Sequence, residues 1–256
     1  MRSLPIAELR RRAQGTAPLA GREPLLGRTF RFFSVYLTWI FIRLPITPNQ
    51  ITAVSVLFFF LGIGLFAWNN LTPQLVGCAI IYFSTVLDAS DGEVARLKYP
   101  KNIAGGIYAE PVSHDFQYAF MYFPLTLGAY SATGTLVTVL FGAVAVVAKL
   151  LFRLIGARET QLSMWMKIES SAGAVSAKDF QVAFNPDVGR FHKFYRFINR
   201  TFMGSGNHVI LLTIFALLRR LDLFLLLFAV YNSAVLAVTF VNQLRRLPKP
   251  KAEGAL

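Results

Sequence analysis

The stretch PQLVGCAIIYFSTVLDASDGEVAR, residues 73–96, decides the class of this protein. It starts as an apolar segment long enough to cross a bilayer, for which about 20 residues are needed, and it ends with two aspartates, Asp88 and Asp91. An ionisable side chain in a membrane span costs free energy unless it is paired, hydrated or bound to a metal. The stretch therefore predicts a transmembrane helix that carries a functional site at one end.

The composition of the 256-residue chain predicts an all-α, polytopic membrane protein. Hydrophobic residues make up 55% of the chain and the mean hydropathy is +0.50, which is too apolar for one ordinary soluble domain. The predicted six-helix transmembrane bundle has spans at about residues 50–70, 73–95, 105–130, 134–156, 206–219 and 221–243, of which the fifth is short. The single Cys78 cannot form an intrachain disulfide and is expected to serve packing.

The net charge of +13 indicates membrane orientation and anionic lipid headgroups as partners, and not nucleic acid, because the basic residues flank the apolar runs. No cleavable signal peptide is expected in the arginine-rich first forty residues. With a cytoplasmic amino terminus, the inner segments hold Arg96, Lys98, Lys101, Arg158, Lys167, Lys178, Arg245, Arg246, Lys249 and Lys251. This asymmetry follows the positive-inside rule and predicts an integral protein of a bacterial inner membrane, with its site on the cytoplasmic side.

Polar segments flank and interrupt the predicted spans. Residues 1–48 form a cytoplasmic and juxtamembrane segment, in which residues 28–45 predict an amphipathic helix that lies on the membrane surface or packs against other helices. The transmembrane domain covers residues 49–243, with a cytoplasmic loop at about 157–205, and residues 244–256 form a cytoplasmic tail. Within the loop, residues 190–202 have the spacing of an interfacial helix, or of a cytoplasmic helix packed on the bundle.

Four side chains on two consecutive predicted helices carry the candidate chemistry. Asp88 and Asp91 lie three residues apart, so that they share a helix face and can hold one divalent cation. Glu110 and His114 lie one turn apart on the next helix. Carboxylate oxygens suit Mg²⁺ or Mn²⁺, with substrate phosphate and water completing the shell, and the histidine is the natural general base.

Other residues near these acids have candidate roles. Gly92 and Ala95 leave room beside the aspartates for a flat or phosphorylated ligand, and Arg96 can brace a carboxylate or a phosphate. Lys149 and Arg153, at the inner end of the fourth predicted span, are expected to reach the interface or to bind an anionic headgroup or an acceptor phosphate.

The run LDASDGEVAR, residues 87–96, resembles the signature of the CDP-alcohol phosphotransferase family, Asp-x-x-Asp-Gly-x-x-Ala-Arg, eight residues, Gly-x-x-x-Asp-x-x-x-Asp. The first half matches fully, and ITPNQIT at residues 46–52 is also similar. The resemblance implies transfer of a phosphate-linked group from a CDP-activated donor to a hydroxyl, release of CMP, a divalent metal and a homodimer. The nucleotide contacts that it implies are Asn49, Thr52, Asp88, Gly92, Ala95 and Arg96. Helix capping explains Asn49 equally well.

The second half of the signature departs from the family. At strict spacing its glycine is Gly105 and its acidic positions fall on Ala109 and Ser113. With one extra loop residue the glycine is Gly106, and the acidic positions are filled by Glu110 and His114. We adopt this register because an insertion in a short loop costs little.

The resulting catalytic set is His114, Asp91 and Glu110, and the metal ligands are Asp88, Asp91, Glu110 and His114. The histidine replaces the aspartate that serves as base in the family. Asp115 points about 100° away on the helix and is the weaker candidate.

Three alternatives stay open at this point. The donor is expected to be CDP-diacylglycerol, giving phosphatidyl transfer in phospholipid biosynthesis, or else a soluble CDP-alcohol with a lipid acceptor. A member that only binds nucleotide or lipid is also compatible, and in such a protein Asp88 and Asp91 would be structural partners of Arg96 and Lys98. A transporter is disfavoured because the acids gather toward one membrane face.

Overall fold

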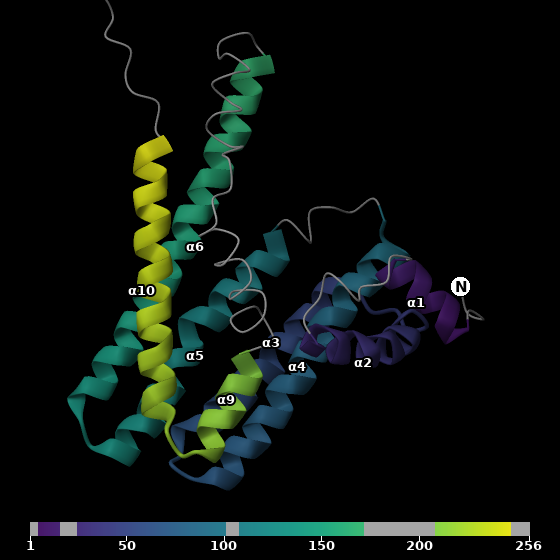
Figure 1. The fold of residues 1–256 in the computed structure, drawn as a ribbon. Helices are drawn as coiled ribbons and strands as arrows, with labels where there is room; N and C mark the ends of the chain where they lie inside the picture. Colours follow the sequence, from purple (N-terminus) through teal and green to yellow (C-terminus); the bar gives the residue numbers. More distant parts are fainter. Residues whose placement is uncertain (1–4, 16–24, 101–107, 172–207, 247–256) are drawn as a thin grey trace, which may run out of the picture.

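A computed structural model describes residues 5–15, 25–100, 108–171 and 208–246. These residues form helices and no strand (Figure 1), which confirms the all-α prediction for this part of the chain. In chain order the helices are α1 (Ile6–Gln14), α2 (Leu25–Phe41), α3 (Pro48–Gly64), the 3-10 turn η2 (Leu65–Ala67), α4 (Leu71–Lys98), α5 (Glu110–Thr133), α6 (Leu136–Ser171), α9 (His208–Leu217) and α10 (Leu221–Arg246).

Within the described residues, four helical segments are long and apolar enough to cross a membrane, which makes the protein an integral membrane protein: Pro48–Ala67, Leu71–Lys98, Leu136–Trp165 and Leu221–Leu244. They correspond to four of the six predicted spans. The other two predicted spans do not correspond to a helix that is both long and apolar enough among the described residues. Helix α9 is apolar but has only ten residues, and α5 carries Glu110, His114 and Asp115 in its first turns.

Local sequence signals set several helix boundaries. Thr47 caps α3: its side chain accepts a hydrogen bond from the Gln50 backbone, the Gln50 side chain accepts one from the Thr47 backbone, and Pro48 occupies the first turn. The prediction that Asn49 caps this helix is therefore wrong, because the cap lies two residues earlier. Gly134, at φ 67°, allows the chain to turn from α5 into α6.

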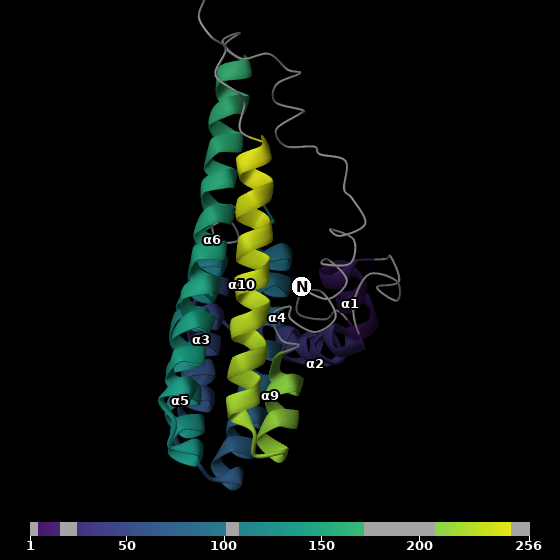
Figure 2. The same ribbon diagram turned by 60° about the vertical axis from the view of Figure 1, so that its left-hand side comes forward.

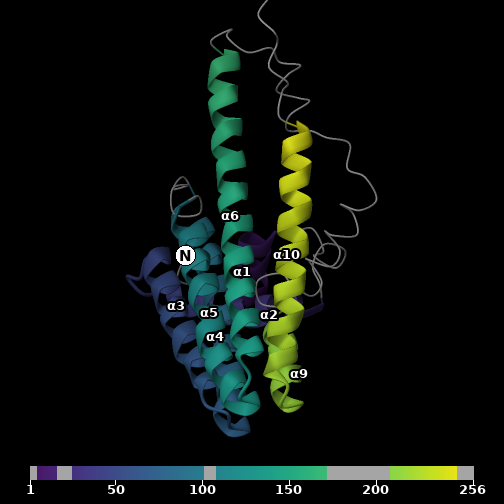
Figure 3. The same cartoon turned by 90° about the vertical axis from the view of Figure 1, so that its left-hand side faces the viewer.

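Helices α6 and α10 run side by side and project beyond the rest of the bundle (Figures 2 and 3). Helix α6 continues past the predicted end of its span at residue 156, so that the first part of the expected loop at 157–205 is helical as far as Ser171. In this projection Gln243 of α10 donates a hydrogen bond to Glu159 of α6 (3.3 Å). The predicted interfacial helix at 190–202 lies outside the described residues.

Helices α3 and α4 approach each other closely because each presents a glycine at the contact. A Cβ built on Gly77 would lie 2.5 Å from the carbonyl oxygen of Gly62, closer than such atoms pack. Nearer the candidate site, the Ser84 hydroxyl donates to the carbonyl of Ser55 (2.7 Å). The small residues thus allow backbone contact, and a hydroxyl adds an interhelical hydrogen bond, as is common in membrane bundles.

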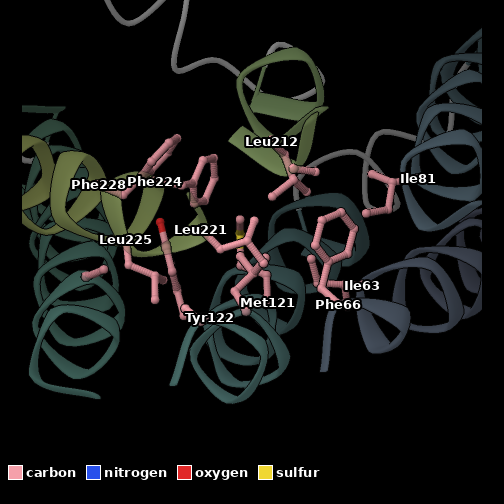
Figure 4. Packing of buried hydrophobic residues seen from close by; sticks show 14 of the residues in the cluster. Ile63, Phe66, Ile81, Met121, Tyr122, Leu212, Leu221, Phe224, Leu225 and Phe228 are labelled. Atoms are coloured by element: carbon pink, nitrogen blue, oxygen red, sulfur yellow. The ribbon is translucent and has the colours of Figure 1, made fainter. Parts of the chain in front are cut away.

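The main core lies between α3, α4, α5, α6, α9 and α10, away from the acids. Figure 4 shows Met121 and Tyr122 of α5 meeting Phe224 of α10 and Leu212 of α9. One polar group is built into it: Asn232 of α10 donates to the Tyr122 hydroxyl (3.1 Å) and to the carbonyl of Ala145 (3.0 Å). Cys78 packs in this core, as its apolar context predicts.

Helices α1 and α2 lie against one end of α4, and α2 runs across the direction of α6 and α10 (Figures 1 and 2). A second, smaller core of Ile51, Leu87 and Val94 joins this end of α4 to α3 and to partly buried residues of α2 and the α2–α3 connection. The opposite face of α2 exposes Phe32, Phe33, Tyr36, Trp39 and Ile40. Residues 28–45 are therefore helical as far as Phe41 and packed on one side, while their contact with a membrane surface stays a prediction.

Candidate functional site

The two aspartates of α4 face the neighbouring helices α3 and α5. Asp91 is buried, at 8% exposure, and its Oδ2 accepts a hydrogen bond of 2.5 Å from the Thr52 hydroxyl of α3. That hydroxyl also lies 3.1 Å from the carbonyl oxygen of Pro48, in the preceding turn. Thr52, expected to contact a nucleotide, therefore fixes the orientation of an acid from the adjacent helix.

His114 of α5 lies beside the first aspartate. Its Nε2 is 3.8 Å from Oδ2 of Asp88, and its ring stacks on Tyr118, one turn further along α5, with ring centroids 6.3 Å apart. Ser113, which the strict family spacing would place at the site, donates instead to the carbonyl of Glu110 within its own helix. Of Ser113 and His114, it is therefore His114 that approaches the aspartates, the residue selected by the register that starts from Gly106. Gly105 and Gly106 lie outside the described residues.

Asp88 has an unsatisfied oxygen. Its Oδ1 is buried and has no hydrogen-bond partner among the described residues, while Oδ2 is the atom facing His114. Buried polar atoms are nearly always hydrogen-bonded, because desolvation without a partner is costly. An unpartnered carboxylate oxygen beside a second carboxylate is therefore a position that suits a bound cation or a hydrogen-bond donor of a ligand.

Glu110 is less closely joined to the acids than the sequence predicts. Its side chain is exposed in the first turn of α5, although its charge lies within electrostatic range of both Asp88 and Asp91. Within the described ranges, no three His, Cys, Asp or Glu side chains are grouped closely enough to hold a metal ion by themselves. The aspartate pair fits a hard divalent cation in the nature of its donors, and the remaining ligands would come from substrate phosphate and water.

The cationic residues that follow the aspartates bind backbone carbonyls. Arg96 Nε donates to the carbonyl of Ala13 at the end of α1 (2.7 Å), and its guanidinium covers Gly92, whose added Cβ would lie 3.4 Å from Nη1. Lys98 Nζ donates to the carbonyls of Phe41, Leu44 and Ile46 (2.6–3.2 Å). These contacts give no support to the alternative in which Arg96 and Lys98 are the structural partners of the aspartates.

Lys149 and Arg153 of α6 lie beside the histidine helix, separated from His114 by Tyr118. Lys149 Nζ is 4.3 Å and Arg153 Cζ 5.3 Å from the centroid of the Tyr118 ring. Arg153 also pairs with Asp115 and donates to the carbonyl of Pro111 (3.2 Å). Asp115, the weaker sequence candidate, therefore serves an ion pair between α5 and α6.

The remaining predicted contacts are less informative. Asn49 is exposed in the first turn of α3, and the backbone carbonyl of Ala95 accepts a hydrogen bond from Tyr99 at the end of α4. Neither side chain touches the aspartates in any contact that the described residues show.

The sequence analysis missed Glu93, which lies between the motif residues and is 1% exposed. Its Oε1 accepts hydrogen bonds from Gln14 of α1 (2.7 Å) and Ser34 of α2 (2.6 Å), and its Oε2 accepts one from Thr38 of α2 (2.7 Å). A signal was present: Ser34 and Thr38 lie one turn apart in an otherwise apolar-rich helix, so that they form a polar patch that needs a partner.

Comparison of the chain with protein-family models gives no match, and comparison with curated proteins gives none. The functional argument for this protein therefore depends on its own residues and their arrangement.

Proposed function

We propose that this protein is an integral membrane CDP-alcohol phosphotransferase, a divergent member of the family that its motif resembles. One observation carries the proposal: side chains from three helices converge at one end of the bundle, with Asp91 held by Thr52 and Asp88 facing His114. The sequence analysis selected all four residues: three come from the motif, and Thr52 comes from the start of the first predicted span. Their convergence supports a single reaction site.

The aspartates supply the acidic half of the proposed site. Asp88 and Asp91 would hold Mg²⁺ or Mn²⁺, with Glu110 as a further ligand, and such a cation neutralises the diphosphate and stabilises the departing CMP. Asp88 Oδ1, which has no partner within the ranges that the structure describes, supports this assignment because this oxygen is then available to a cation. Thr52 keeps the second carboxylate turned toward α3.

His114 supplies the base. In the proposed reaction the acceptor hydroxyl attacks the phosphorus distal to the cytidine, the bond from this phosphorus to the CMP oxygen breaks, and the hydroxyl proton passes to Nε2 of His114. The Asp88 carboxylate at 3.8 Å stabilises the imidazolium that forms, and the Tyr118 ring supports the imidazole from one side.

The donor proposed is CDP-diacylglycerol, because the aspartates lie toward the end of α4, a helix long and apolar enough to cross a membrane, where a lipid-anchored donor can reach them. Lys149 and Arg153 extend the site toward α6 and provide positive charge for a phosphorylated acceptor or a headgroup. The basic segments beside the spans support a site on the cytoplasmic side of the membrane. The family resemblance implies a homodimer. A soluble CDP-alcohol with a lipid acceptor is the alternative donor arrangement.

The test is CMP release by the purified protein in lipid with Mg²⁺ or Mn²⁺, comparing CDP-diacylglycerol with soluble CDP-alcohols across a panel of acceptor alcohols. We expect metal-dependent release that falls by about 100-fold or more in His114→Ala. The matched control is Ser113→Ala, which removes a neighbouring side chain whose hydrogen bond stays within α5 and should leave the rate unchanged. Equal rates in wild type and His114→Ala would remove His114 from the mechanism.

A binding protein without catalysis is the second candidate, and one observation favours it. The pairing of His114 with Asp88, together with the exposed position of Glu110, gives an arrangement in which a charged histidine can occupy the place of a cation. Such a protein would bind CDP-diacylglycerol without releasing CMP, and its affinity would not depend on Mg²⁺ or Mn²⁺. Equilibrium binding measured alongside CMP release separates the two functions.

A further inference from the structure

Glu93 receives more hydrogen bonds than either aspartate, yet it lies on the other side of α4. At 100° per residue, Glu93 is turned about 160° from Asp91 and about 140° from Asp88 around the helix axis. Asp91 meets α3 through Thr52, whereas Glu93 meets α1 and α2 through Gln14, Ser34 and Thr38. The inner end of α4 is therefore held by directional contacts on two nearly opposite faces.

The contacts of Glu93 form part of a wider attachment of the amino-terminal helices. Gln14 donates to Glu93 and also to the carbonyl of Arg31, which joins the end of α1 to α2. Arg96 holds the carbonyl of Ala13, and Lys98 holds three carbonyls at and beyond the end of α2. We name α1 and α2 together with these contacts the amino-terminal clasp.

Burying a carboxylate costs more free energy than is needed for a contact that only holds helices together. Glu93 is 1% exposed and its three hydrogen bonds come from neutral donors, with Arg96, one turn along α4, within electrostatic range. Packing in the small core of Ile51, Leu87 and Val94 already joins α2 to α4. The carboxylate adds a directional constraint on α4, because rotation or sliding of this helix would break all three hydrogen bonds together.

We infer that Glu93 is a positioning residue: through the amino-terminal clasp it fixes the rotation of α4, and thereby the direction in which Asp88 and Asp91 present their oxygens to a divalent cation. This inference rests on the proposed function, since it concerns the metal affinity of the same site. Glu93 itself does not touch the reacting groups. Its effect passes through the backbone of two turns of α4.

The experiment measures Mn²⁺ binding and backbone exchange on the full chain in lipid. Binding of Mn²⁺ alone is followed by the electron paramagnetic resonance signal of the free ion, and hydrogen–deuterium exchange is measured over Ile6–Gln14 and Leu25–Phe41. In Glu93→Ala we expect faster exchange in both helices and an Mn²⁺ affinity lower by about tenfold, the size of effect known for residues that orient metal ligands. Glu93→Gln, which keeps the shape and one acceptor oxygen, should give a smaller loss.

The matched control lies on the same helix. Gln74 is 3% exposed at the opposite end of α4, where its Nε2 donates to the carbonyl of Trp68 (2.9 Å). Gln74→Ala therefore removes a buried polar side chain from α4 without touching the clasp, and it should leave the Mn²⁺ affinity unchanged. An equal loss of affinity in Gln74→Ala and Glu93→Ala would overturn the inference, because the effect would then reflect general instability.

Other outcomes are also decisive. Faster exchange of the clasp with unchanged Mn²⁺ affinity would show that Glu93 only attaches the helices, and would overturn its positioning role while leaving the proposed function intact. A wild-type chain that neither binds Mn²⁺ nor releases CMP would overturn both. If Glu93→Ala does not fold, Thr38→Val removes one of the three bonds, and a two- to threefold loss of affinity is expected there; no loss would count against the inference.

Discussion

The two faces at the carboxyl-terminal end of α4 carry acids with opposite surroundings. On the face toward α1 and α2, both oxygens of Glu93 accept hydrogen bonds. On the face toward α3 and α5, Asp91 has one bond from a hydroxyl, and Asp88 has a buried oxygen without a partner among the described residues. A carboxylate whose two oxygens are both hydrogen-bonded contributes to the fold. A buried oxygen without a partner has a desolvation cost that a bound ligand can remove.

This contrast predicts that stability and the proposed activity depend on different faces of a single helix. Substitutions on the Glu93 face should weaken the fold first, because they leave buried donors without acceptors. Substitutions of Asp88 should weaken the proposed reaction and leave the fold unchanged or improved, as is common where a site retains groups that the fold does not need.

The largest expected effect is that of Asp88→Asn. The amide has nearly the same shape but no charge, so that the proposed CMP release should fall by about 100-fold or more, while burial of a neutral group keeps the thermal midpoint of the metal-free protein at or above that of wild type. CMP release and a thermal unfolding scan in detergent measure the two quantities. A lowered midpoint would show that Asp88 is a structural residue and that the contrast between the faces is wrong.

A thermodynamic cycle on the other face should give the next effect. Glu93→Leu leaves the side-chain donors of Gln14, Ser34 and Thr38 without their acceptor and should cost about 1–3 kcal/mol in the free energy of unfolding. Adding Ser34→Ala and Thr38→Val removes two of these donors, so that the combined variant should lose less than the sum of its parts. Unfolding by titration with a denaturing detergent measures the coupling. Strict additivity would mean that these bonds do not act as one unit.

The smallest expected effect is that of Thr52→Val. Valine preserves the shape of the side chain but removes the hydroxyl that donates to Asp91, so that the Mn²⁺ concentration for half-maximal CMP release should rise by about tenfold. The control is Ser55→Ala, one turn along α3, because the Ser55 hydroxyl donates to the carbonyl of Thr52 in its own helix. If wild type and Thr52→Val need the same Mn²⁺ concentration, Asp91 keeps its orientation without the hydrogen bond from α3.

Much of the fold follows from the linear pattern. The apolar runs at 50–70, 73–95, 134–156 and 221–243 correspond to four apolar helices that can cross a membrane, because hydropathy over about 20 residues is a local property. The residue at which a helix ends, and the membrane contact of a less apolar helix, depend on context. Helix α6 continues to Ser171, beyond its apolar window, and packs along α10, while α5 contains too many polar side chains to be recognised as a span by composition.

The candidate site was predictable as a set of residues but not as a set of contacts. The motif selected Asp88, Asp91 and His114 from their spacing, and these side chains lie near one another. It also assigned Arg96 a role toward carboxylate or phosphate, whereas this side chain binds the backbone of α1, a helix more than eighty residues away in sequence. Long-range backbone acceptors have no signature in a local motif.

The sequence by itself determined the all-helical, membrane-embedded class of this protein and the residues that carry its proposed chemistry, because apolar length and helical spacing are properties of neighbouring residues. The tertiary structure alone decided which acids are satisfied. Glu93 and Asp88 are both acids of the same motif. Only the packing of α1 and α2 on one face of α4 and of α5 on the other gives Glu93 three donors and leaves Asp88 with an oxygen that has no partner in the described part of the chain.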